Sequence, residues 1–180
     1  MLKIKNPLSV VSLKYGIAGI VLSILAIIVM YYLVSHPLSI IVVNPLMDIR
    51  IPLYLLLVFA ALKEFKDYYG GGYLHFWQAM IIGVGVYMIT SLGTAIFIFI
   101  ISKVEVSGFL TGYIEQSKAY LILNKEEYFV QLGEDRFNQA VNGLDEVSAL
   151  SLTSQYLLQS TFIGLFLTFI LSIIMRKKNH

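Results

Sequence analysis

The side chains that most often carry catalysis are few in this chain and far apart in its sequence. The three histidines are His36, His75 and His180, and the chain has no cysteine. Acidic residues occur as adjacent pairs at Glu126/Glu127, Glu134/Asp135 and Asp145/Glu146. Neighbouring positions on a helix point in different directions, so these pairs are poor acid–base dyads and are better explained as solvated acids. We therefore expect no catalytic residue, no cofactor and no metal site, and we expect that the protein is not an enzyme.

A second pattern concerns helix packing. Small side chains recur at every fourth position near the C-terminus, at Ser160, Gly164, Thr168 and Ser172. This spacing places them on one face of a helix, and small residues allow two helices to approach closely in lipid. Ala79 and Gly83 show the same spacing earlier in the chain. These six residues predict a helix-packing surface within the chain or an interface with a partner.

The most distinctive local sequence lies between residues 63 and 79 and contains three consecutive glycines. Glycines permit a tight turn with positive φ, and the aromatic residues around them suit a membrane–water interface. We interpret this segment as a cytoplasmic turn that anchors the next helix, with partner docking as the alternative. The docking residues would be Lys63, Asp67, Gly70, Gly71, Gly72, Phe76 and Gln78.

Composition shows which elements must position these residues. The chain has 180 residues, of which 58% are hydrophobic and 13% are charged, and its mean hydropathy is +0.79. A soluble domain carries about 25% charged residues. The composition therefore predicts an integral membrane protein. Nucleic acid is not an expected partner, because the basic residues cluster at the two chain ends and not on a folded basic face.

A membrane-spanning helix needs about 20 apolar residues, and three segments meet this requirement directly, at 15–34, 76–101 and 155–175. A fourth and weaker span over 48–65 requires Arg50 and Lys63 to reach toward opposite membrane surfaces. The sequence thus predicts an all-α integral membrane four-helix bundle that forms a single domain over 1–180. No small-residue cleavage site follows the first span, so we expect it to be retained rather than removed as a signal peptide.

Charge distribution predicts the topology of the bundle. The tails 1–14 and 176–180 carry three basic residues each and no acidic residue, which places both on the cytoplasmic side and requires an even number of crossings. The segment 103–150 is then exterior, and its acidic residues outnumber its basic ones. We expect it to form two short amphipathic helices. Pro37–Pro45 is too short to span, and we expect it to be interfacial or re-entrant.

The residues of the glycine-rich turn and the helix after it resemble a known family signature. Lys63, Lys66-Asp67, Gly70-Gly71-Gly72, Phe76-x-Gln78-Ala79 and Gly83 are similar to the central signature of a bacterial four-helix integral membrane family catalogued as a domain of unknown function (four-one-nine-nine). The order of spans, the long exterior segment and the terminal Arg176-Lys177-Lys178 are similar too, so the resemblance extends over nearly the whole chain. It implies the bacterial cytoplasmic (inner) membrane, and it implies no activity.

These patterns predict a non-enzymatic accessory, assembly or sensing subunit, with a small oligomeric transporter or channel as the alternative. No acidic or basic residue lies near the middle of a predicted span, whereas ion-coupled pumps usually place ionisable groups there. The expected partners are membrane lipids and either further copies of the chain or other membrane protein subunits.

Overall fold

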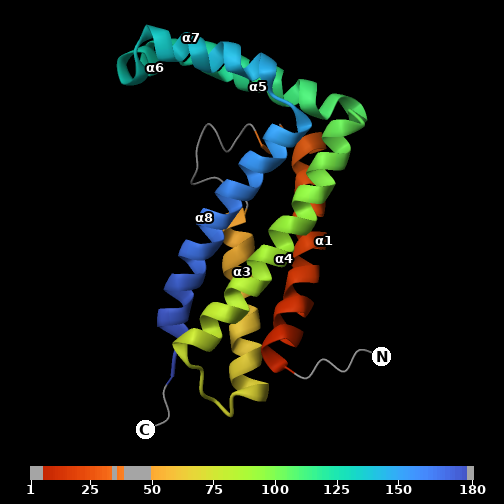
Figure 1. The fold of residues 1–180 in the computed structure, drawn as a ribbon, viewed down its shortest axis with the longest axis vertical. Helices are drawn as coiled ribbons and strands as arrows, with labels where there is room; N and C mark the ends of the chain where they lie inside the picture. The colour runs from red at the N-terminus through yellow and green to blue at the C-terminus, as the bar shows by residue number, and fades with distance from the viewer. Residues whose placement is uncertain (1–5, 34–35, 39–49, 178–180) are drawn as a thin grey trace. The chain divides into compact units, whose positions relative to one another are not determined.

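The computed structural model describes residues 6–33, 36–38 and 50–177, and Figure 1 shows their helices in chain order. The α-helices are α1 (Pro7–Leu33), α3 (Arg50–Glu64), α4 (Phe76–Lys103), α5 (Phe109–Leu123), α6 (Lys125–Leu132), α7 (Glu134–Gly143) and α8 (Ala149–Met175). The shorter helical elements are the π-helix η2 (Phe65–Tyr69) and the 3-10 helices η3 (Val106–Gly108) and η4 (Leu144–Glu146). Helices account for all the regular structure of these residues apart from one isolated β-bridge. The predicted all-α class is confirmed.

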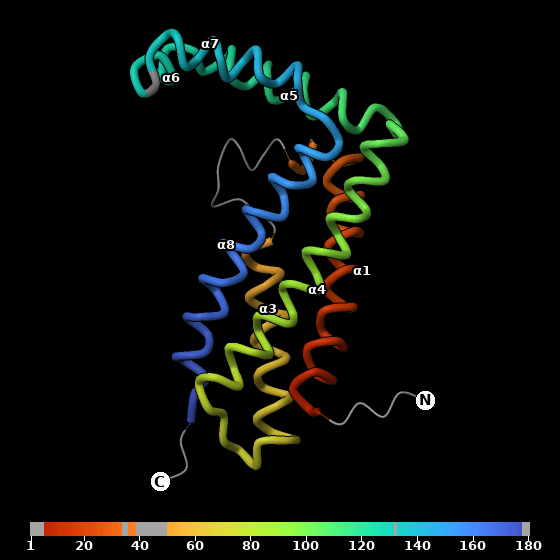
Figure 2. Tube along the Cα trace, viewed as in Figure 1, coloured from red at the N-terminus to blue at the C-terminus, as the bar shows by residue number. Residues whose placement is uncertain are grey.

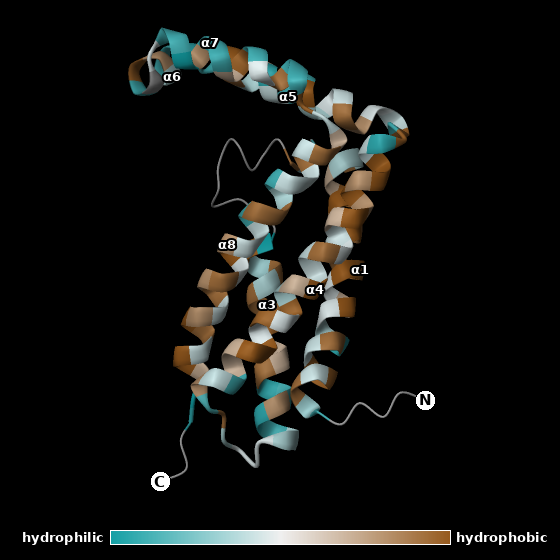
Figure 3. Ribbon diagram, viewed as in Figure 1, coloured by the Kyte–Doolittle hydropathy of each residue, from teal (hydrophilic) through white to brown (hydrophobic). Residues whose placement is uncertain are grey.

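Three of these helices, α1, α4 and α8, are long and apolar enough to cross a membrane, with 27, 28 and 27 residues. At 1.5 Å per residue each extends about 40 Å, which exceeds the hydrocarbon core of about 30 Å. Figure 3 shows apolar residues along all three helices, whereas α7 is largely polar. These lengths and compositions indicate a membrane protein. α3 has 15 residues and is shorter than these three helices.

Several helix boundaries differ from the predicted ones. α1 begins at Pro7, well before the predicted start at residue 15. Proline suits a first helical turn because the N–H that it lacks would be unpaired there, and the Asn6 Oδ1 accepts the N–H of Leu8 at 3.1 Å. The predicted interfacial or re-entrant segment Pro37–Pro45 is described only as far as Leu38, and its remainder lies outside the described residues.

The chain divides into two compact units, and its path can be followed in Figure 2. The first unit comprises Met1–Ala26, Ile49–Ala95 and Leu157–His180, and the second comprises Ile27–Asp48 and Ile96–Tyr156. Each of the long helices α1, α4 and α8 contributes residues to both units.

Four helices contribute to the hydrophobic core of the first unit. Leu8 and Val11 of α1, Leu171 of α8 and residues of α3 and α4 form one buried cluster. α3 is deeply buried on one face, where Tyr54, Val58, Ala61 and Leu62 have no exposed surface. The shortest of these four helices therefore packs one face into the core of the unit, while Leu55, Leu56 and Phe59 on α3 are exposed.

In the second unit, the segment between α4 and α8 forms three α-helices and not the two that the sequence predicts. The breaks between the three helices lie at Asn124, where φ is −105°, and at Gly133, where φ is +81°. The positive φ at Gly133 is a conformation that glycine adopts at little cost. An ion pair of 2.5 Å between Lys118 and Asp145 connects α5 to η4.

Candidate functional site

The small residues predicted to pack or to bind a partner lie inside the first unit. All six are buried: Ser160, Gly164, Thr168, Ser172, Ala79 and Gly83. A Cβ added to Gly164 would lie 2.4 Å from Cγ of Tyr87, and one added to Gly83 would lie 2.4 Å from Cγ2 of Thr168. Both contacts join α8 to α4 at distances that only glycine allows. The surface of these residues is therefore occupied by contacts within the chain.

Arg50, the first residue of α3, is a charged residue buried in the first unit with 3% of its surface exposed. Its Nη1 donates to Oγ of Ser160 at 2.8 Å, and its Nη2 donates to Oε1 of Gln159 at 3.1 Å. The sequence predicts that Arg50 reaches toward the membrane surface, but the structure turns the guanidinium toward α8. A buried charge is costly unless hydrogen bonds replace its water shell, and the two polar neighbours on α8 supply such bonds.

A sequence signal for this contact exists. Gln159 and Ser160 are adjacent polar residues within a largely apolar helix, and polar residues within such helices usually face another part of the protein. Their spacing from Arg50 in the sequence is large, so the pairing itself depends on how α3 and α8 pack. The sequence patterns therefore pointed to Arg50 and Ser160 separately and did not predict their contact.

The glycine-rich turn, interpreted from the sequence as a helix anchor with docking as the alternative, is held by its own backbone. The N–H of Gly70 donates to the carbonyl of Phe65 at 2.8 Å, and that of Gly72 donates to the carbonyl of Lys66 at 2.9 Å. Gly71 and Gly72 have φ of +59° and +83°, which suit glycine. The π-helix η2 leads directly into this turn, so the local geometry is defined without any partner.

Of the other candidate docking residues, two are exposed and two contact other residues of the chain. Lys63 and Asp67 are exposed. Gln78 is engaged at the start of α4, where its Oε1 accepts the N–H of His75 at 3.0 Å. Phe76 packs edge-on against Phe169 of α8, with ring centroids 5.9 Å apart.

A backbone contact that the sequence does not predict ties this turn to the end of α8. The N–H of Leu74 donates to the carbonyl of Lys177 at 3.1 Å, and the N–H of Lys177 donates back to the carbonyl of Leu74 at 3.0 Å. Leu74 has no exposed surface. An isolated bridge of this kind has no periodic pattern, so sequence reasoning had no signal for it.

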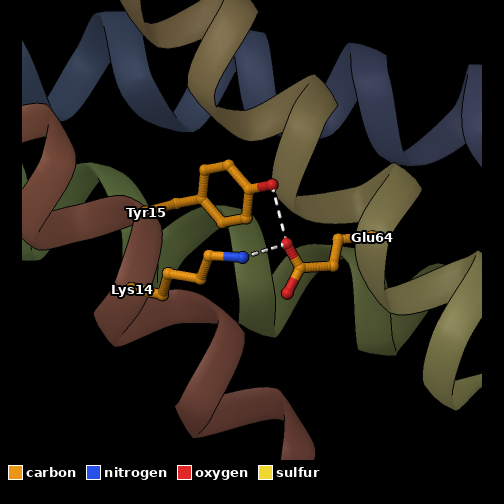
Figure 4. Close-up of polar contacts among 3 residues, drawn as sticks. All are labelled: Lys14, Tyr15 and Glu64. Carbon is orange, nitrogen blue, oxygen red and sulfur yellow. Dashed lines mark hydrogen bonds and ion pairs between the residues drawn. The ribbon is translucent and has the colours of Figure 1, made fainter.

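A polar contact also joins α1 to α3 in the first unit, as Figure 4 shows. One carboxylate oxygen of Glu64 accepts hydrogen bonds from the Nζ of Lys14 at 2.5 Å and from the hydroxyl of Tyr15 at 2.8 Å. The Lys14 side chain is 59% exposed, and exposed ion pairs contribute little to stability. This contact joins α1 to α3.

The second unit contains an aromatic cluster around His36, which is fully buried. Its ring centroid lies 4.4 Å from that of Phe109 and 5.6 Å from those of Tyr31 and Tyr113. The backbone N–H of His36 donates to Oε1 of Gln116 at 2.8 Å. Burial lowers the pKa of His36 to about 4, and a hydrogen bond with the Phe109 backbone opposes this shift. A neutral imidazole therefore packs here as an aromatic ring.

Beside this cluster lies a cavity of about 350 Å³. Its lining is apolar apart from the tyrosines Tyr31 and Tyr32. The Tyr31 hydroxyl is already engaged, because it donates to the carbonyl of Ser107 at 2.7 Å. Within residues 6–33, 36–38 and 50–177, no group of three or more His, Cys, Asp and Glu residues could hold a metal ion.

The helices and contacts above define an all-α protein with helices of membrane-spanning type. The family described as Protein of unknown function (DUF4199) matches residues 14–177. The chain belongs to this family, which confirms the family resemblance of its sequence. The match extends from α1 to the bridge residue Lys177. No curated protein and no solved structure matches the chain.

Proposed function

We propose that this chain is a four-helix, four-pass membrane subunit without enzymatic activity that assists the assembly or the sensing function of other membrane proteins. It resides in a bacterial cytoplasmic membrane with both termini on the cytoplasmic side. The proposal is supported by the packing of the first unit and by the surface of the segment between α4 and α8.

The packing of the first unit supports an even number of crossings. Leu8 near the start of α1 and Leu171 near the end of α8 belong to one buried cluster, as expected if both helix ends lie on one side of the membrane. α3 runs from Arg50 to Glu64, and its 15 residues extend about 22 Å, so its charged ends lie near the two surfaces of a hydrocarbon core of about 30 Å.

The main support for the non-enzymatic role is that several buried polar groups of the first unit bind one another or the backbone. Arg50 binds Gln159 and Ser160, and the Thr90 hydroxyl donates to the carbonyl of Gly16 at 3.2 Å. The Ser12 hydroxyl of α1 donates to the carbonyl of Ile82 in α4 at 3.3 Å. Groups used in this way hold helices together and are not available to bind a substrate.

The segment between α4 and α8 supplies the surface for a partner. Ile122, Leu123 and Val130 of α5 and α6 are 59%, 83% and 88% exposed. These large apolar side chains lie outside the three long apolar helices, next to charged residues such as Lys125 and Glu126. Exposed apolar residues rimmed by charges are typical of protein-binding surfaces.

Site-directed crosslinking tests this role, because the chain has no cysteine of its own. We would introduce Leu123→Cys and Val130→Cys separately and treat intact native membranes with a short thiol–amine crosslinker. The matched control is Phe162→Cys on α8, which is 73% exposed and faces lipid in our proposal. We expect one discrete crosslinked species from the α5–α6 positions and none from the control.

The mass of the crosslinked species distinguishes a second copy of the chain from a different subunit. If all three variants remain monomeric, or if the control crosslinks as efficiently as the α5–α6 positions, this segment does not bind a partner and the accessory role is rejected.

A specific observation also supports the alternative, a small oligomeric transporter or channel. The hydroxyls of Thr168 and Ser172 are buried and have no hydrogen-bond partner among the described residues. With Ser160 they form a line of hydroxyl groups along α8. Solute flux into proteoliposomes that is absent from empty liposomes, and that is lost in Thr168→Val, would favour transport over the accessory role.

A further inference from the structure

A second cavity, of about 450 Å³, lies in the second unit. The last turn of α4, the first turn of α5 and the first turn of α8 contribute its lining. Polar residues line one part of it and apolar residues line another, unlike the cavity beside Tyr31. We call it the α4–α8 cavity.

The polar lining includes the last two residues of α4, Ser102 and Lys103. Lys103 is exposed, and no ion pair or hydrogen bond of its ammonium group is found among the described residues. Ser102 is 3% exposed, and its buried hydroxyl has no hydrogen-bond partner within that part of the chain. A helical serine can bond the carbonyl four residues earlier, but the Ser102 hydroxyl does not, so it is available to donate to a ligand in the cavity.

The first turn of α8 adds donors of the same kind. Ala149 and Leu150 line the cavity and are the first two residues of a 27-residue helix. The first N–H groups of a helix have no acceptor within the helix, and the helix dipole makes this end positive. Ser148 caps the turn by accepting the N–H of Ser151 at 3.2 Å. This arrangement favours an anion.

No carboxylate lines the cavity to neutralise these donors. Glu105 is close in sequence, but its carboxylate is used at the start of α5. There it accepts the N–H groups of Leu110 at 3.3 Å and of Thr111 at 2.9 Å. The net electrostatic character of the cavity is therefore set by Lys103 and by the α8 N-terminus.

The apolar lining consists of Phe99, Leu110 and Leu150. Phe99 and Leu150 are 38% and 66% exposed. A ligand that satisfies both parts of the lining has an anionic group attached to a hydrocarbon chain. The cavity also lies at the end of an apolar helix, the depth at which headgroups replace acyl chains in a bilayer.

We propose that the α4–α8 cavity binds an anionic phospholipid. Its phosphate accepts hydrogen bonds from Lys103, from the Ser102 hydroxyl and from the first turn of α8, and an acyl chain lies against Phe99, Leu110 and Leu150. This site depends on the membrane location of the chain but not on its accessory role, so each can fail without the other.

Native mass spectrometry of the full chain in detergent tests the site. Delipidated protein would be titrated with short-chain phosphatidylglycerol, with phosphatidylcholine of equal chain length, and with inorganic phosphate. We expect phosphatidylglycerol to bind at least about tenfold more tightly than phosphatidylcholine, because the cavity is cationic. Inorganic phosphate should not displace it at equal concentration, because phosphate lacks the acyl chain.

Single substitutions test whether the lipid binds in the α4–α8 cavity. Lys103→Gln should weaken phosphatidylglycerol binding about tenfold, since a hydrogen bond to a charged group is lost, and Ser102→Ala should weaken it less. Lys125→Gln is the matched control, because it removes one exposed positive charge from the same unit outside the cavity. Circular dichroism of each variant shows that it retains the helical fold.

Equal affinity for the two lipids, or equal loss in Lys103→Gln and Lys125→Gln, would overturn the site. Displacement of the lipid by inorganic phosphate at equal concentration would show instead that the cavity is a site for free anions.

Discussion

Gly164 and Tyr87 show how tightly single residues are fitted in the first unit. The Cβ of any larger residue at position 164 would lie 2.4 Å from Cγ of Tyr87. This is well inside ordinary contact distance, and Tyr87 is itself only 3% exposed, so its ring has little room to move. Close packing of this kind transmits even a small volume change to the helices.

Gly164→Ala should therefore destabilise the protein by about 1–3 kcal/mol, the usual cost of overpacking a core. Thermal unfolding in a fixed detergent measures the effect. The matched control is Gly143→Ala in α7, where an added Cβ has nothing within 4 Å. If the two variants unfold at the same temperature, the close contact between α4 and α8 does not contribute to stability.

His36 makes the stability of the protein depend on pH. Its pKa is lowered from 6.5 to about 4 by burial, so the unfolded chain binds a proton in this range more readily than the folded one. Stability is therefore complete above about pH 6.5 and is lost as the pH falls toward 4.

The free energy of unfolding should fall by up to about 3 kcal/mol between pH 6.5 and pH 4 because of this residue. His36→Phe should remove that part of the pH dependence, since phenylalanine preserves an aromatic ring without a titratable group. His75→Asn at an exposed position is the control and should keep the wild-type profile. Identical profiles for wild type and His36→Phe would exclude His36 as the titrating group.

Spacing alone predicted that the small residues of α8 share one packing face. A repeat of four residues places side chains on one side of a helix, whatever that side contacts. The direction of the Arg50 side chain could not be predicted in this way. It depends on the relative register of α3 and α8, which are more than 100 residues apart in the chain. Local propensity carries no information about such a register.

At the scale of helices, Arg50 connects the start of α3 to α8. Its two hydrogen bonds reach neighbouring residues, Gln159 and Ser160. A bidentate donor of this geometry holds two helices in one register more firmly than a flexible ammonium group.

Arg50→Leu should cost about 1.5–3 kcal/mol of stability, the range for hydrogen bonds to a charged group, and Arg50→Lys should recover only part of the loss. Arg136→Leu is the control, because Arg136 is exposed on α7. Unfolding of each variant in the same detergent measures the difference. A fully stable Arg50→Leu protein would show that apolar packing, and not the guanidinium, joins these helices.

The weak fourth span illustrates what helix prediction could and could not achieve. Hydropathy identified α1, α4 and α8 because long apolar runs have no other stable environment than lipid. α3 gave a weaker signal, since its continuation as a π-helix through Phe65–Tyr69 has no distinct sequence pattern. The break at Asn124 was missed for a related reason, because asparagine also occurs within helices.

For the whole molecule, the arrangement of the chain in the membrane follows from the four proposed crossings. The clustering of Leu8 with Leu171 and the basic residues at both chain ends favour a cytoplasmic location for both termini. The segment α5–α7 then lies on the exterior side.

Single-cysteine labelling tests this arrangement on a background free of other thiols. Asn6→Cys and Arg176→Cys should resist a membrane-impermeant maleimide in intact spheroplasts and react in inverted vesicles. Ile122 is 59% exposed. Ile122→Cys should show the opposite pattern, with labelling in intact spheroplasts and protection in inverted vesicles. Labelling of Asn6→Cys and Arg176→Cys from opposite sides would require an odd number of crossings.

The paired backbones of Leu74 and Lys177 also limit how this protein can be handled in the laboratory. A reporter or purification tag fused directly after Met175 would replace one strand of that pair and uncover a leucine that is otherwise fully enclosed. Fusions should therefore begin beyond Lys177 and include a spacer, or be placed at the other end of the gene.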